Sequence, residues 1–384
     1  MPEKGLIHMA NTLVRHTTFP PQLSHGHRQL QKTLVTLCEE VQQIVNGGLR
    51  KEVDDVQHEA GLKLLTHQGG CPQNVLLLAP HRLALITPQA QPRPTWATTN
   101  NPLAARDRQL CDEALTQIDH ILASLDEVRA SHLAETLDAR LREALRDGPL
   151  DINDDTLLSD GGNEINLPEF NDSLWEPVRR LLGDDLLGDT DTFTPTERGG
   201  GVHVIIDPLA VYKAQATISQ TSSKPHTPTA ATLTAVQIIE RAAPEIEYYA
   251  LKLLMCATRR SLSLTSLTRV VRIHELAHLV THLGLDASWQ HWHTFYSASD
   301  DHIEGSAQDI THRLLERRFR HQLMTPRAKR RAQSKRDLYS FKRLLKDQPR
   351  PYLVYAYWRW LMKDHQERRQ WLIQARVTGN FAPF

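Results

Sequence analysis

Hydrophobic residues recur at three- and four-residue steps through much of this chain, which is the spacing of amphipathic helices. The first such pattern opens at Ser24 and closes at Gly47-Gly48, and its apolar stripe consists of Leu30, Leu34, Leu37, Val41 and Ile44. A second pattern covers residues 53–65, and one or two long helices are expected over residues 103–146. The chain is therefore predicted to be mainly helical.

Shorter apolar runs interrupt these patterns and predict a few strands. Residues 75–78 and 83–86 are separated by a Pro-His break, so we expect them to pair as a hairpin. Residues 202–207 follow three glycines and predict a further strand. Residues 230–257 are expected to be helical, with Pro244 marking a break between two helices. The predicted fold class is α+β, with helices predominating.

The order of these patterns divides the chain into four parts. Residues 1–150 are expected to form a mainly helical N-terminal domain that includes the hairpin, and residues 151–200 an acidic, irregular connection. Residues 201–325 have a mixed α+β character and contain the candidate chemistry. Residues 326–384 form a basic and aromatic helical C-terminal region. We therefore expect a small core flanked by helical regions on both sides.

The net charge is zero, but the charges are unevenly distributed. Residues 151–198 contain 13 acidic and 3 basic side chains, whereas residues 313–350 contain 14 basic and 3 acidic ones. Such blocks are usually solvated faces, and two blocks of opposite sign can also dock on each other. Aromatic side chains interleaved with Lys and Arg near the C-terminus pack together, or contact a partner protein or a nucleic acid.

Composition limits the location and the class of the protein. No apolar run reaches the ~20 residues that a membrane span needs, and the N-terminus lacks the basic and apolar segments of a signal peptide. We therefore expect a cytoplasmic protein without a membrane partner. The cysteines form no CxxC pair, which argues against a disulfide framework and a structural zinc ribbon; they are Cys38, Cys71, Cys111 and Cys256.

The clearest chemical motif is the run His274-Glu275-Leu276-Ala277-His278. Two histidines four residues apart lie about 40° apart around a helix, so both imidazoles can bind one metal ion. Glu275 is not needed as a ligand and can act as the general base that takes a proton from a metal-activated water. Apolar neighbours on both sides of the motif indicate a buried helix, and Gly284 is a plausible end to it.

A catalytic zinc ion takes three protein ligands, so a third must come from elsewhere. Metzincins place a glycine three residues after the second histidine, where this chain has Thr281. His282 lies one turn farther along the same helix, about 6 Å from His278, which is too far for one tetrahedron. Glu304 is the better candidate, with Asp300 or Asp301 as the alternative.

The histidine motif, with Glu304 26 residues after His278 and the small residue Ala307 three beyond the glutamate, resembles the gluzincin zinc peptidases. Residues 261–318 carry the resemblance, and the motif's flanks are also similar to those of the ImmA/IrrE-type metallopeptidases. The resemblance implies a small zincin-like core. In it, zinc is held by His274, His278 and Glu304, and the glutamate lies on a second helix that packs across the first.

The predicted activity is that of a zinc-dependent endopeptidase acting on a protein substrate. An additional donor should stabilise the oxyanion of the transition state, and the candidates are Tyr296, His302, His291 and His293. Where larger gluzincins have an aspartate that orients a ligand histidine, this chain has Gln308 followed by Asp309, and His282 is a further candidate for such an outer contact. The alternative is a regulatory protein that binds nucleic acid or protein and has a structural or inactive zincin-like core.

Overall fold

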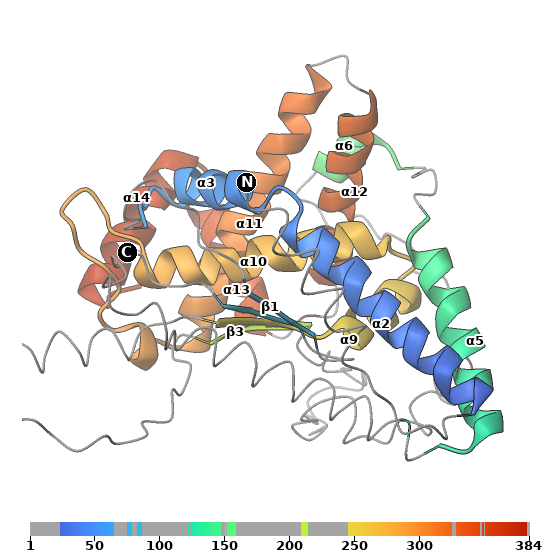
Figure 1. Cartoon of the computed structure of the whole chain (residues 1–384). Helices are drawn as coiled ribbons and strands as arrows, with labels where there is room; N and C mark the ends of the chain where they lie inside the picture. Colours follow the sequence, from blue (N-terminus) through green and yellow to red (C-terminus); the bar gives the residue numbers. More distant parts are fainter. Residues whose placement is uncertain are drawn as a thin grey trace, which may run out of the picture.

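A computed structural model describes the protein at residues 24–64, 75–78, 83–86, 122, 125–146, 150, 152–158, 209–213, 245–324, 328–345, 348 and 350–381. The described part is mainly helical, with one small antiparallel sheet (Figure 1). Among these residues, no helix combines the length and the apolar character that crossing a bilayer requires. The expected predominance of helices is thus confirmed for this part of the chain.

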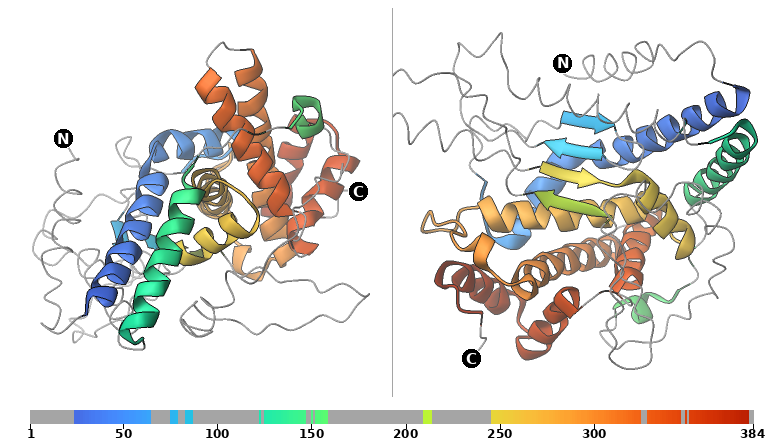
Figure 2. Two further views of the ribbon diagram at one scale, coloured as in Figure 1. Left: turned by 90° about the vertical axis from the view of Figure 1, so that its right-hand side faces the viewer. Right: turned by 90° about the horizontal axis from the view of Figure 1, so that it is seen from below.

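The N-terminal helices are α2 (His25–Asn46), α3 (Leu49–Ala60) and α5 (Glu127–Ala144). The Ser24 hydroxyl accepts a hydrogen bond from the His27 N–H, and Gly47 ends α2, as the sequence predicts. Four residues of the predicted apolar stripe are buried and Ile44 is partly buried; α5 lies beside α2 and packs on it (Figure 2, left). Of the helices expected over residues 103–146, only α5 lies within the described residues.

The sheet contains β1 (Val75–Leu78), β2 (Leu83–Ile86), β3 (Ala210–Lys213) and β4 (Glu245–Tyr248). Its order is β1-β2-β4-β3 and every pairing is antiparallel (Figure 2, right). The predicted hairpin over residues 75–86 is therefore confirmed. The strand predicted over residues 202–207 lies outside the described residues. Because β3 pairs only with β4, it forms one edge of the described sheet.

The prediction of a helix directly after Pro244 is wrong. Residues 245–248 alternate Glu-Ile-Glu-Tyr, and the structure buries Ile246 and Tyr248 while the backbone pairs with both β2 and β3. Two-residue alternation is the pattern of a strand, and it prevails here over the helical pattern on either side. The helix begins only at α9 (Ala250–Arg259).

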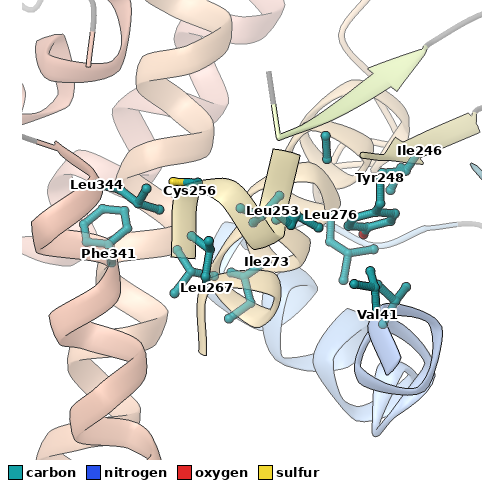
Figure 3. Close-up of a cluster of buried hydrophobic side chains, with 14 of the residues drawn as sticks. Val41, Ile246, Tyr248, Leu253, Cys256, Leu267, Ile273, Leu276, Phe341 and Leu344 are labelled. Carbon is teal, nitrogen blue, oxygen red and sulfur yellow. The ribbon is translucent and has the colours of Figure 1, made fainter. Parts of the chain in front are cut away.

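Helix α10 (Leu264–Leu283) runs through the middle of the protein and is buried along almost its whole length. Its apolar residues pack with α9, β4, α2 and α12 in one continuous core, part of which is drawn in Figure 3. Val41, Tyr248 and Phe341 enter this core from distant parts of the chain. Because α10 is buried on nearly all sides, its polar side chains must find partners on the surrounding elements.

The remaining helices belong to the C-terminal part of the chain, and they cover one side of α10. They are α11 (Asp300–Leu323), α12 (Ala328–Leu345), α13 (Arg350–Leu361) and α14 (His365–Thr378). The end of α11 and the start of α12 project as a hairpin, and the short helix α6 (Asp154–Leu158) lies beside α12 (Figure 1). Asp154 pairs there with Arg331 and Lys335, so the acidic and basic blocks do contact each other.

Buried ion pairs join the N-terminal helices to α10. The Arg272 guanidinium pairs with Glu52 of α3 and donates hydrogen bonds to the carbonyls of Ile44, Val45 and Gly47 at the end of α2. Arg318 of α11 binds the other oxygen of Glu52. A helix C-terminus carries carbonyls without partners in its own helix, so one arginine here both caps α2 and anchors α3.

Candidate metal centre

Helices α10 and α11 bring three potential metal ligands together. His274 and His278 lie one turn apart on α10, and Glu304 lies in the first turns of α11, which packs on α10. Their side chains are 11%, 5% and 21% exposed, respectively. Within the described residues, these three are the only group of histidine, cysteine and acidic side chains close enough to hold an ion.

The three ligand atoms form a compact triangle. The Nε2 atoms of His274 and His278 are 3.0 Å apart, and Glu304 Oε2 lies 3.0 Å from the first and 3.3 Å from the second. Ligand atoms at 2.0–2.1 Å from a tetrahedral metal ion are about 3.3 Å from one another, so the triangle has the size of one face of such a site. The three residues therefore fit a single small metal ion.

Glu275 lies between the two histidines in sequence and is buried, with 5% of its surface exposed. Burial and the nearby Glu304 carboxylate raise the pKa of Glu275 to about 7, against the opposing effects of His274 and of a hydrogen bond from the Tyr212 backbone N–H. For Glu304, burial would raise the pKa, but the two histidines hold it well below its ordinary value. The two carboxyl groups thus differ strongly in basicity.

Tyr352 of α13 lies beside the ligand triangle, and the sequence did not single it out as a candidate site residue. Its ring stacks on His274 at 5.7 Å between centroids, and its hydroxyl hydrogen-bonds to Glu304. Burial and the carboxylates Glu304 and Glu275 raise its pKa well above the ordinary value, so the hydroxyl keeps its proton and remains a donor. Tyr352 is 48 residues beyond Glu304, and no short motif links the two.

Gly305 explains how α13 comes so close to the metal ligands. A Cβ atom at this position would lie only 2.4 Å from Val354 and 2.7 Å from Trp358. A side chain here would therefore push α13 away from α11, and Tyr352 with it. A glycine within a helical pattern, directly after a suspected ligand, is the sequence signal that another backbone or side chain packs closely there.

The other expected donors take different positions. The His302 ring stacks on Phe381 at 4.0 Å, and its Nδ1 lies 3.0 Å from the Ser299 hydroxyl. His291 and His293 contact each other, with ring centroids 3.9 Å apart. The side chain of Tyr296 lies outside the described part. None of the contacts seen for these three histidines involves the metal-ligand triangle.

The alternative acidic ligands are also placed apart from the triangle. Asp301 lies 3.3 Å from the exposed Arg350 guanidinium, in an ion pair. Neither Asp300 nor Asp301 belongs to the group of converging ligand atoms. Among the candidates for a third ligand, the described structure brings only Glu304 to the two histidines.

Asp309 does not make the expected hydrogen bond to a ligand histidine. Its carboxylate pairs with Arg313 and Arg368, both at 2.8 Å, in a fully buried network. Gln308 is buried, and its amide oxygen has no hydrogen-bond partner in the described part. The Nδ1 atoms of His274 and His278 likewise find no partner among the described residues.

His282 contacts a strand and does not reach the ligand triangle. Its Nδ1 lies 2.8 Å from the Tyr212 hydroxyl of β3, and its ring stacks on Phe295 at 4.2 Å. Burial, with a smaller effect of His291, lowers the pKa of His282 to about 4. The imidazole is therefore neutral at neutral pH and can accept a hydrogen bond from the hydroxyl.

Comparisons with protein-family models, with curated proteins and with solved structures found no match for this chain. The functional assignment therefore depends on the residues and the geometry of the site itself.

Proposed function

We propose that this protein is a zinc-dependent endopeptidase with a zincin-like core, in which residues His274, His278 and Glu304 bind the ion. The observation that carries the proposal is the triangle of ligand atoms with edges of 3.0, 3.0 and 3.3 Å beside a buried glutamate. Two imidazoles and one carboxylate are a donor set typical of catalytic zinc, which keeps a fourth position open. A structural zinc site usually has four protein ligands and needs no adjacent base.

Zinc bound there would lower the pKa of a coordinated water to about 7 and polarise the carbonyl of the scissile peptide bond. The role of Glu275 follows from its buried position next to the ligand His274. Its carboxylate takes a proton from the water that attacks the carbonyl carbon, and it delivers the proton to the amide nitrogen as the C–N bond breaks.

Tyr352 is placed to stabilise the oxyanion. Its hydroxyl remains protonated and lies beside Glu304, so it can donate a hydrogen bond to the carbonyl oxygen when negative charge develops there. In this proposal Tyr352 is the oxyanion donor, a role for which Tyr296 and His302 were among the candidates from the sequence. The backbone N–H of Tyr212, on strand β3, donates a hydrogen bond to the Glu275 carboxylate.

Glu275→Gln tests the proposal directly, because the amide retains the size of the side chain and cannot take a proton. We expect the wild-type protein to contain one zinc ion per chain and to cleave an unfolded protein such as reduced, alkylated casein. The variant should retain zinc and lose about 10²–10⁴-fold in cleavage rate. Metal analysis and peptide mass spectrometry measure the two quantities.

The matched control is Glu143→Gln, which makes the same change at an exposed position of α5. It should leave cleavage unchanged. If Glu275→Gln cleaves as fast as the wild type, or if neither protein binds zinc, the proposed function is wrong.

A further inference from the structure

Strand β3 lies at the edge of the sheet and packs against α10 at the metal centre. Tyr212 is the residue of β3 at which this contact is concentrated. Its ring lies parallel to His278 at 6.3 Å between centroids, and it meets Phe295 edge-on at 6.1 Å. Its backbone N–H donates to Glu275. One residue of a strand thus contacts both a metal ligand and the proposed base.

The Tyr212 hydroxyl extends past His278 to the next turn of α10. There it lies 2.8 Å from Nδ1 of His282, whose side chain is buried. A neutral imidazole nitrogen and a phenol hydroxyl satisfy each other, whereas each would carry a desolvation penalty if it were buried alone. The histidine ring is also held flat on Phe295. The hydrogen bond therefore has a rigid acceptor.

The spacing of the three histidines explains why His282 suits this task. His274, His278 and His282 follow one another at intervals of four residues, so they line one face of α10. The first two reach the ligand triangle, and the third, one turn farther on, reaches β3. The same face of the helix thus carries two candidate metal ligands at one end and contacts the strand at the other.

We propose that Tyr212 and His282 form a positioning pair that holds β3 at a fixed distance from α10. The hydrogen bond anchors the end of the Tyr212 side chain, and this keeps its backbone N–H on Glu275 and its ring against His278. A shift of β3 would move the Tyr212 backbone N–H relative to Glu275, the proposed general base. This inference rests on the proposed peptidase function for its consequence in catalysis, but not for the placement of the strand.

Three variants separate the hydrogen bond from simple packing. Tyr212→Phe removes only the hydroxyl. His282→Phe keeps a flat ring on Phe295 but removes the acceptor, whereas His282→Asn loses the ring and offers an amide oxygen close to the position of Nδ1. We expect Tyr212→Phe and His282→Phe each to lower kcat by about 10-fold with little change in KM or zinc content. His282→Asn should remain within about 3-fold of the wild type.

The double variant Tyr212→Phe/His282→Phe tests whether the two side chains act as a unit. Its kcat should fall by about 10-fold, as in either single variant, and not by the ~100-fold that independent effects would produce. A fall of about 100-fold would overturn the pair. So would an active His282→Phe combined with an inactive His282→Asn, because that order means that the ring and not the hydrogen bond matters.

Amide hydrogen exchange of β3, followed by mass spectrometry on zinc-free protein, tests the placement without any catalysis. Exchange of residues 210–213 should accelerate by about 10-fold in Tyr212→Phe and His282→Phe and stay near wild type in His282→Asn. Unchanged exchange in the first two variants would overturn the inference. If Glu275→Gln cleaves as fast as the wild type while exchange is accelerated in Tyr212→Phe and His282→Phe, the peptidase function is wrong and the positioning pair is supported.

Discussion

Two kinds of buried carboxylate lie around α10 and α11, and they differ in how their charges are compensated. Glu52 is bound by Arg272 and Arg318, and Asp309 is bound by Arg313 and Arg368. Glu304, on the same helix as Asp309, has two histidines and a tyrosine hydroxyl around it and no arginine among its described partners.

We infer from this difference that the carboxylates with arginine partners stabilise the fold, whereas Glu304 is available to bind a ligand. A carboxylate that is buried with guanidinium partners already has its compensating charge, so it has no reason to bind a cation. The Glu304 carboxylate converges with two imidazoles and has no guanidinium beside it among the described residues. Its ligand atoms point at one place, and a divalent ion would supply the missing positive charge. The predictions below test that separation.

The largest effect on stability is expected from Arg272→Met. The change leaves three carbonyls at the end of α2 without their donor and removes one of the two arginines from buried Glu52. We expect the free energy of unfolding to fall by about 3–5 kcal/mol, as measured by urea denaturation. Arg317→Met removes an exposed guanidinium from Glu59, which still has Arg313 as a partner, and it should cost no more than about 1 kcal/mol. Equal losses would contradict the comparison.

Tyr352→Phe removes the hydroxyl from the metal centre and retains the ring that stacks on His274. We expect kcat for peptide cleavage to fall by about 10²–10³-fold, because a donor to the oxyanion is lost, while zinc content stays the same. Tyr357→Phe is the matched control on the exposed side of α13 and should be neutral. A variant with normal kcat would assign the oxyanion to another residue.

Glu304→Gln and Asp309→Asn each replace a carboxylate with the corresponding amide, the first in the ligand triangle and the second in a buried arginine network. The first should lower zinc affinity by more than about 100-fold, since even the loss of an outer contact costs about 10–100-fold. Asp309→Asn should retain zinc affinity and lose stability, because two buried arginines lose their partner. Competition with a chromogenic chelator and thermal unfolding provide the measurements.

The smallest effect concerns the dependence of stability on pH. Burial, together with the charges of Arg359, Lys342 and Arg368, lowers the pKa of His312 well below its ordinary value of 6.5. The unfolded chain therefore binds a proton below that pH and the folded protein does not. Stability is fully present above pH 6.5 and falls as the pH drops, by up to about 1.4 kcal/mol per pH unit for this residue.

His312→Leu should reduce this slope between pH 6.5 and pH 5, as measured by urea denaturation at several pH values. His132→Leu, at an exposed position of α5, makes the same change in composition and should leave the slope as it is. A slope unchanged in both variants would mean that His312 is protonated in the folded protein.

The helices and their ends were largely predictable from the sequence because each depends on local chemistry. Ser24 and Gly47 bound α2, and Gly284 ends α10, at the positions where capping residues were expected. The prediction was wrong at residues 245–248, where partners from distant strands make a strand favourable. Pairing between strands depends on segments that are far apart in sequence, so a local pattern cannot reveal it.

By itself, the sequence determined the placement of three candidate site residues on one helix. The spacing of four residues places His274 and His278 side by side, with Glu275 next to them, whatever the rest of the chain does. Only the tertiary structure decided which distant side chains complete the centre. Glu304 arrives from α11, Tyr352 from α13 past Gly305, and Tyr212 from β3. A helix repeats every few residues, but the approach of separate elements depends on how they pack, and no spacing along the chain records that.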